Sequence, residues 1–453
     1  MRLLILAFAA LFALSACQKT SPPGEAPTGV TATAGDGLVV VSWDMLPDLT
    51  YWIFFQPGST VDVATPNSFA IRRAFSPRPL GPLANGTQYA FVMNATHNDS
   101  AAGPNSLPVV ATPRLAGNSW VSGTPLVTTP GTAPGNLRGI AFNGTRFVTV
   151  GDATTTAGVT SPTIFAGDFN YPVGQFNFTT GDPQGVTQWM QPSPTTLPLN
   201  FTSNLASVIF TSTGAFVALG ADGSVILSGD GLTWTSTSIA AVPASGMNSL
   251  AFGFVGGTIG TYVAVGNGGV IYVSDQSLTK WTLVPSGTTN DLTSVSLVSL
   301  QNGVFIVTGA GGTLLMSQNP NDGNPFTSLN SNTTNTLRGV TGGPSLPSST
   351  GVLYVAVGDA GTIVTSPSVL NPTVDFTPAT ITPPIAQNLR GVTVGGSAGT
   401  RFLAVGDAGA VAYSDDGVQW FSAASGSDNL AKVLYVGGLY MGVGDAGANA
   451  VAR

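Results

Sequence analysis

Three residue types that carry much of enzyme chemistry are almost missing from this chain. Its 453 residues include one histidine, His97, one cysteine, Cys17, and one glutamate, Glu25. A single cysteine excludes an internal disulfide and a thiolate metal cluster. Because no histidine or glutamate follows His97, most of the chain cannot build a histidine-based triad or a multi-histidine metal site. We therefore expect no metal, no cofactor and no enzyme activity, since only Asp, Tyr and Lys remain there for acid–base chemistry.

Charged residues are also scarce, at 8% of the chain, and the formal net charge is −7. Nucleic acids and anionic membrane surfaces attract clusters of Lys and Arg, so this balance predicts no nucleic-acid partner. The 58 glycines, together with many Val, Thr, Ser and Asn and few helix formers, indicate an all-β protein.

The N-terminus carries a short apolar run. It spans residues 3–14 and follows Arg2, whereas a membrane-spanning helix needs about 18 apolar residues. A basic start, a short apolar run and small residues before a cleavage point are typical of an export signal. We therefore predict a signal peptide over residues 1–16.

The string LSAC, which ends at Cys17, resembles the bacterial lipobox. This resemblance implies that Cys17 is acylated and that Gln18 directs the lipoprotein to the outer membrane, with the lipid as its anchor. An ordinary cleaved signal with a chance cysteine is the alternative. Residues 17–26 would then be the lipidated cysteine and a polar tether that reaches at most about 30 Å.

Residues 27–114 alternate apolar and polar positions in short segments separated by Gly, Pro and Asn, which predicts a β-sandwich. Trp43 at the end of the second predicted strand and the string LANGTQY, which ends at Tyr89, resemble a fibronectin type III domain. In such a domain the Tyr89 hydroxyl would bond to the backbone near Leu83. We interpret His97, after a later strand, as a solvated loop residue, with a binding role as the alternative.

The rest of the chain repeats one β unit at a period of roughly 41 to 52 residues, the length of a four-stranded propeller blade. A second strand that ends in a tight turn, such as YVAVGDAG or FLAVGDAG, follows each opening strand. Residues 115–453 are therefore predicted to form a seven-bladed β-propeller. The opening strands begin at Asn136, Asn204, Met247, Asp291, Thr336, Asn388 and Asn429.

The seventh repeat ends at Arg453 after only three strands. Trp120 precedes the first repeat as Trp420 precedes the last, so we predict that the strand around Trp120 completes the seventh blade and closes the ring. One large aromatic residue leads each fourth strand, and we interpret it as a wedge between blades, with ligand stacking as the alternative. These residues are Trp189, Trp234, Trp281, Phe326, Phe376, Trp420 and Trp120.

The strings SGDGLTW and SDDGVQW resemble the Asp-box of sialidase-type propellers, where the box is structural. The resemblance implies a carboxylate that accepts backbone N–H bonds and a glycine with positive φ. Together with VAVGDAGTIV, the boxes resemble the propeller family of photosystem II assembly and stability factors over residues 136–453. The predicted structural residues are Asp230, Gly231 and Trp234 in the first box and Asp416, Gly417 and Trp420 in the second.

Arg138, Arg338 and Arg390 occupy the same phase, LRG, in three repeats. In the resembled fold this phase lies on the rim that also carries the turn aspartates. A ring of guanidinium groups near the channel mouth could bind a carboxylate or an acidic partner segment. The alternative is that each arginine only braces its turn. The turn aspartates are Asp152, Asp359, Asp407 and Asp445.

The first repeat contains an extra segment, roughly residues 153–200, that we predict as an insertion. Long loops on propellers often carry function, but aromatic loops must also bury themselves, and both interpretations stay open. Its aromatic residues are Phe165, Phe169, Tyr171, Phe176 and Phe178.

The favoured function is a non-catalytic protein-binding or assembly scaffold in the cell envelope, most simply a monomer. A surface adhesin or glycan-binding protein is the alternative, because Ser/Thr/Asn-rich surfaces suit glycans. A sialidase-like glycan hydrolase is less favoured, because the propeller has no glutamate for the catalytic constellation of that family.

Overall fold

The computed structural model describes residues 21–453 except 65–68, 98, 100, 128–134, 157, 170–185, 194–195, 199–200, 237–240, 243, 245, 256–258, 299–302, 323–324, 346–350, 368–374 and 397–398. The chain divides into two compact units, whose described parts lie within residues 21–114 and 115–453. The described elements are strands and short 3-10 turns, so the predicted all-β class is confirmed. No helix in the described residues is long and apolar enough to cross a membrane.

The N-terminal unit is a sandwich of two antiparallel sheets that enclose one apolar core. Tyr51, Ile53 and Phe91 from one sheet meet Val39 and Val41 from the other. The three-stranded sheet has the order β1 (Thr31–Gly35), β2 (Leu38–Ser42), β5 (Arg78–Leu80), and the four-stranded sheet has the order β4 (Phe69–Ala74), β3 (Thr50–Pro57), β6 (Tyr89–Thr96), β7 (Val109–Ala111).

Two single residues of this unit were singled out from the sequence. The Ala84 amide donates a hydrogen bond to the Tyr89 hydroxyl at 3.2 Å, so the Tyr89 contact expected beside Leu83 is present. A ring nitrogen of the half-buried His97, Nδ1, lies 3.3 Å from the carbonyl oxygen of Asp48.

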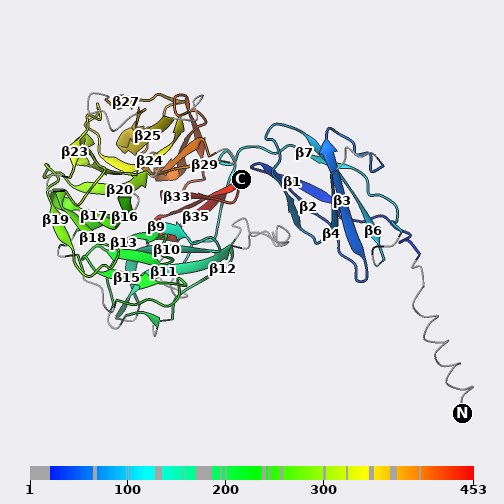
Figure 1. The fold of residues 1–453 in the computed structure, drawn as a ribbon, viewed down its shortest axis with the longest axis horizontal. Helices are drawn as coiled ribbons and strands as arrows, with labels where there is room; N and C mark the ends of the chain where they lie inside the picture. Colours follow the sequence, from blue (N-terminus) through cyan, green and yellow to red (C-terminus); the bar gives the residue numbers. More distant parts are fainter. Residues whose placement is uncertain are drawn as a thin grey trace, which may run out of the picture. The chain divides into compact units, whose positions relative to one another are not determined.

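The C-terminal unit consists of seven antiparallel sheets arranged as the blades of a propeller (Figure 1). Blade 1 contains β9 (Leu137–Phe142), β10 (Arg146–Thr156), β11 (Val159–Phe169) and β12 (Val186–Met190). Blade 2 contains β13 (Leu205–Phe210), β14 (Phe216–Gly220) and β15 (Val225–Ser228). Blade 3 contains β16 (Met247–Val255), β17 (Ile259–Gly266), β18 (Ile271–Asp275) and β19 (Thr282–Val284). Blade 4 contains β20 (Leu292–Val298), β21 (Val304–Gly309), β22 (Leu314–Ser317) and β23 (Thr327–Ser328).

The remaining blades follow the same plan. Blade 5 contains β24 (Leu337–Ser345), β25 (Gly351–Gly358), β26 (Ile363–Ser366) and β27 (Thr377–Pro378). Blade 6 contains β29 (Leu389–Gly395), β30 (Arg401–Gly406), β31 (Ala410–Ser414) and β32 (Trp420–Ala424), with β28 (Ile381–Thr382) added in parallel at its outer edge. Blade 7 contains β33 (Leu430–Val436), β34 (Leu439–Gly444), β35 (Asn449–Ala452) and β8 (Trp120–Ser122).

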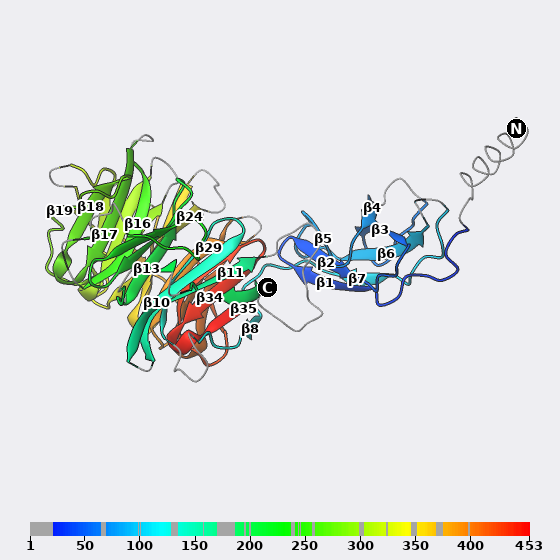
Figure 2. The same ribbon diagram turned by 90° about the horizontal axis from the view of Figure 1, so that it is seen from below.

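The ring closes where the sequence predicts. Strand β8 pairs with the last strand of the chain, with Trp120 opposite Ala452 and Ser122 opposite Ala450 (Figure 2). The amide of Gly123 continues this pairing with a 2.8 Å bond to the carbonyl oxygen of Asn449. The opening strands contact one another in the cyclic order β9, β13, β16, β20, β24, β29, β33 and again β9. The predicted seven-bladed propeller, closed by the strand around Trp120, is therefore confirmed.

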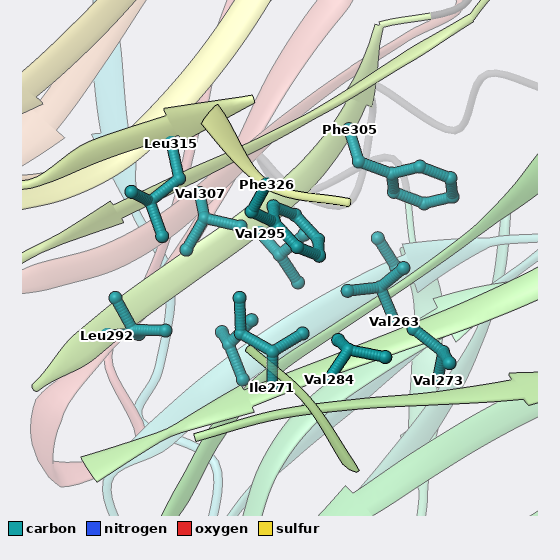
Figure 3. Close-up of a cluster of buried hydrophobic side chains, with 12 residues drawn as sticks. Val263, Ile271, Val273, Val284, Leu292, Val295, Phe305, Val307, Leu315 and Phe326 are labelled. Carbon is teal, nitrogen blue, oxygen red and sulfur yellow. The ribbon is translucent and has the colours of Figure 1, made fainter. Parts of the chain in front are cut away.

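The apolar cores of the propeller lie between neighbouring blades. Figure 3 shows one of them, where Val263 and Val273 of blade 3 face Phe305 and Phe326 of blade 4. Phe326 is one of the aromatic residues that lead the fourth strands. Trp234, Trp281, Phe326, Phe376 and Trp420 are buried, and Trp120 and Trp189 pack partly buried against such cores. This burial agrees with the wedge interpretation.

The predicted insertion in the first repeat was partly wrong. Phe165 and Phe169 lie on β11, a regular strand of blade 1, and are only 3% and 4% exposed. Phe165 and Phe169 are an even number of residues apart, so on a strand their side chains point to the same face of the sheet. Tyr171, Phe176 and Phe178 lie outside the described residues.

Candidate functional site

The candidate site is the rim on which the second strand of each blade ends. In blades 5 to 7 this turn has the sequence Asp-Ala-Gly and forms a single 3-10 turn, for example η6 (Asp407–Gly409). Ala408 has φ +50°, and Gly409 follows with φ +70°. A Cβ atom on Gly409 would lie 2.0 Å from the carbonyl oxygen of Gly426, so only glycine fits there. The turn directs the first residue, the aspartate, toward the opening strand of its own blade.

Two of the three LRG arginines form the same pair with this aspartate. Arg138 donates from Nε and Nη2 to the two carboxylate oxygens of Asp152, at 3.0 and 2.8 Å. Arg338 bonds to Asp359 in the same two-point way, with Nη2 at 3.1 Å from Oδ2. The hydrogen bonds that Arg138 donates to Asp152 raise the pKa of its guanidinium. Such two-point pairs fix the plane of the guanidinium group.

Arg390 is arranged differently, because it joins two blades. Its Nε pairs with Asp407 of its own blade, and its Nη1 donates to Asp445 of blade 7 at 2.8 Å. In blade 7 the LRG phase is occupied by Ala431, so Asp445 has no arginine of its own blade. The carboxylate of Asp445 therefore takes the arginine of the preceding blade.

An asparagine at the start of the opening strand supports each of these turns. Asn388 donates from Nδ2 to Asp407 at 2.9 Å and accepts from the amide of Ala360, in the preceding blade, at 3.1 Å. Asn136, Asn204 and Asn429 likewise accept an amide from the turn of a neighbouring blade. Sequence reasoning missed these residues, although the repeated Asn-Leu at the strand start was a usable signal.

The rim carries arginines at the LRG phase on one side only. Blades 5, 6, 7 and 1 carry the three arginines and the aspartates Asp152, Asp359, Asp407 and Asp445, and we call this set the charged arc. Blades 2 to 4 have Ala206, Asn248 and Thr293 at the arginine phase. An open hollow over blade 3, on the side without these arginines, includes Gly268, Leu283 and Pro285 in its lining.

Part of the charged arc faces solvent. The side chains of Arg138 and Arg338 are 42% and 40% exposed, compared with 25% for Arg390. Within the described part of the chain, no residue bonds to Nη1 of Arg138 or Arg338. One edge of each guanidinium thus braces the turn, while the other edge keeps N–H donors for a ligand.

The Asp-boxes lie at the opposite ends of the third strands, away from the rim. Asp230 accepts the amides of Leu232 and Thr233 at 2.8 and 2.7 Å, and the indole nitrogen of Trp234 donates to the carbonyl oxygen of Gly231 at 3.1 Å. Burial would raise the pKa of Asp230, but the amide and hydroxyl hydrogen bonds outweigh it and lower the pKa.

The second box, at residues 414–420, repeats this geometry. Asp416 accepts the amides of Val418 and Gln419 at 2.8 and 2.9 Å, and Trp420 donates to the carbonyl oxygen of Gly417 at 3.1 Å. Gly231 and Gly417 have φ values of +76° and +74°. Among the described residues, the carboxylates of Asp230 and Asp416 accept hydrogen bonds only within their own boxes, as a structural role requires. One contact from outside, from Nη1 of Arg146 in blade 1 to the carbonyl oxygen of Asp230, holds the first box against its neighbour.

No family model and no curated protein matches this chain. Among solved structures, it is similar to "YCF48 from Cyanidioschyzon merolae", with 16% identity, a TM-score of 0.48, and coverage of 74% of this chain and 98% of that one. It is also similar to "YCF48 bound to D1 peptide", with 16% identity, a TM-score of 0.50, and coverage of 74% and 97%. The likeness is one of fold.

The described residues contain no group of three or more His, Cys, Asp or Glu side chains that could hold a metal ion. Cys17, the predicted lipidation site, lies outside the described residues.

Proposed function

We propose that this protein is a non-catalytic lipoprotein of the outer membrane, whose propeller binds a protein partner at the charged arc. The observation that carries the proposal is the outward guanidinium edge of Arg138 and Arg338, which stays available while the inner edge is held by aspartate. A pre-positioned guanidinium binds carboxylate in two-point geometry at little cost in side-chain entropy.

The solved neighbour "YCF48 bound to D1 peptide" supports a peptide as the type of partner. For this chain, the exposed N–H donors of the arc would receive a carboxylate of an extended segment, either a side chain or a C-terminus. Three arginines face four aspartates in the arc, so long-range attraction is weak. Binding would then depend on short contacts and only modestly on salt concentration.

The anchor and the sandwich complete the proposal. The LSAC string supports acylation at Cys17. The strand orders β1-β2-β5 and β4-β3-β6-β7, together with the Tyr89 hydroxyl contact, support a domain of the fibronectin type III type. In this arrangement the sandwich is a spacer between the membrane and the propeller.

Crosslinking in native membranes, followed by identification of partners, tests the proposal. The two relevant variants are Arg138→Ala/Arg338→Ala, which removes the donors, and Asp152→Asn/Asp359→Asn, which removes the bracing charge but keeps the donors. We expect the first variant to lose the partner and the second to keep it. Arg114→Ala, which removes an exposed arginine of the N-terminal unit, is the control. Equal partner recovery in all variants would contradict the proposal and would mean that Arg138 and Arg338 only stabilise the turns.

A further inference from the structure

The segment that leads from Cys17 joins the sandwich at a defined end. Pro23 is buried and packs closely against Gly103: a Cβ atom placed on Gly103 would lie 2.6 Å from the carbonyl oxygen of Pro23. The amide of Gly103 in turn donates to the carbonyl oxygen of Ala95, near the last residue of β6. The tether therefore leaves the sandwich where β6 ends and its antiparallel partner β3 begins.

Three large apolar side chains are exposed at this same end. Met45, Leu46 and Phe75 are 43%, 59% and 64% exposed, and we call them the tether-end patch. Phe75 lies at this end because the residue before it, Ala74, pairs with Tyr51 at the start of β3. Met45 and Leu46 lie there because the amide of Leu46 binds the Tyr51 hydroxyl. The Sδ atom of Met45 lies 3.4 Å from the amide nitrogen of Ser76, next to Phe75.

A buried scaffold holds the patch outward. Tyr51 is 1% exposed, and its hydroxyl accepts the amide of Leu46 at 2.8 Å and donates to the carbonyl oxygen of Asp44 at 3.3 Å. The amide of Trp43 donates to the Ser76 hydroxyl at 2.8 Å. These bonds fix the backbone of both loops to the core while the three apolar side chains are exposed to water.

We infer that the tether-end patch inserts into the surface of the bilayer that holds the acyl chains of Cys17. This inference rests on the proposed lipid anchor. Residues 17–22 can span at most about 20 Å, which keeps this end of the sandwich within reach of the lipid headgroups. Rigid exposed apolar side chains beside a short lipid tether gain free energy by entering the interface.

The charges near the patch indicate contact through apolar insertion rather than attraction to anionic lipid. Arg73 is paired with Asp99, and the guanidinium of Arg72 lies over the Trp52 ring at 4.6 Å. With Asp44 also nearby, no excess of positive charge gathers there.

The chain offers a clean labelling test, because its single cysteine is consumed by the acyl chains. In the lipidated full-length protein, Leu46→Cys supplies the only free thiol for a polarity-sensitive fluorophore. The protein is reconstituted into phosphatidylethanolamine/phosphatidylglycerol vesicles, with and without brominated acyl chains. Val110→Cys, also exposed and opposite Ala90 near the other end of β6, is the matched control.

We expect the label at position 46 to shift to shorter emission wavelength on vesicles and to lose intensity with brominated lipid, while the label at position 110 does neither. The result should be the same on vesicles of phosphatidylcholine alone. Flotation with an unquenched label at position 46 would overturn the patch and leave the anchor intact. A blue shift without quenching would mean that protein covers the patch, which also overturns the inference. Failure of the protein to float with the vesicles would overturn both anchor and patch.

Discussion

Arg401 donates from Nη1 to the carbonyl oxygen of Ala116 at 2.7 Å, across 285 positions of the sequence. The same guanidinium binds the Asn118 side chain at 2.8 Å and pairs with Asp415. Arg401 is 3% exposed and stacks over the Tyr413 ring. It therefore ties blade 6 to the N-terminal segment that completes blade 7.

Replacement of this arginine should weaken the closure of the ring. We expect Arg401→Met to lower the free energy of unfolding by about 2 to 4 kcal/mol, because several charge-assisted bonds to buried groups are lost. Urea unfolding measures this loss, and limited proteolysis should show earlier cleavage near β8.

Arg146→Met is the matched control for Arg401. Arg146 begins β10 as Arg401 begins β30, and it donates to the carbonyl oxygen of Asp230 in the next blade at 2.6 Å. It is more exposed and does not hold the closing strand, so its loss should cost less and leave β8 protected. Equal protection of β8 in both variants would contradict a closing role for Arg401.

The two Asp-boxes should make the free energy of unfolding depend on pH in the acidic range. The pKa values of Asp230 and Asp416 are lowered in the folded state, so these carboxylates contribute stability above the pKa of the unfolded chain. This contribution is lost as the pH falls below about 4 and through the folded pKa values. We expect Asp230→Asn/Asp416→Asn to flatten the fall in unfolding free energy in that window. An unchanged slope between the variant and the wild type would show that other carboxylates set the acid limit.

The repeat made the propeller predictable, since seven copies of one phase and a missing last strand fix both blade number and closure. The rim contacts were less predictable, because a sequence repeat shows which residues the blades have in common but not which residues of neighbouring blades bond to each other. Arg390 has the same phase as Arg138, yet it bridges to Asp445 because Ala431 leaves that aspartate without an arginine. Phe165 was wrongly assigned to an insertion because β10 and β11 of blade 1 are longer than the corresponding strands of the other blades.

Two glycines of the rim turns allow the cost of a positive φ to be separated from the cost of a steric clash. Gly268, in blade 3, has φ +68° with no atom within 4 Å of the position that a Cβ would take, and it occupies the place that Ala408 takes in blade 6. Gly409 has nearly the same φ, but its Cβ would collide with a backbone carbonyl. We expect Gly268→Ala to cost about 1 to 2 kcal/mol, from backbone strain alone, and Gly409→Ala to cost about 3 kcal/mol or more. Thermal unfolding of the two variants decides this, and equal losses would show that φ alone sets the glycine requirement.

Lys432 is the residue whose replacement should stabilise the protein. It lies on β33, the opening strand of blade 7, where the other six blades have Gly or Ser. The residue as a whole is half-buried, while the protein packed around its ammonium lowers the pKa of that group, and no described residue forms a hydrogen bond or ion pair with it. A desolvated charge without a partner costs free energy that an apolar side chain of similar length does not.

We therefore expect Lys432→Met to raise the melting temperature at neutral pH. Because the folded pKa of Lys432 lies below that of the unfolded chain, the unfolded state binds more protons between the two values. Stability of the wild type should then rise with pH through that window, up to about pH 10.4, and the rise should be smaller in Lys432→Met. Lys280→Met, at an exposed lysine outside the opening strands, serves as the control and should leave both quantities unchanged. A lower melting temperature for Lys432→Met would show that the ammonium has a stabilising partner after all.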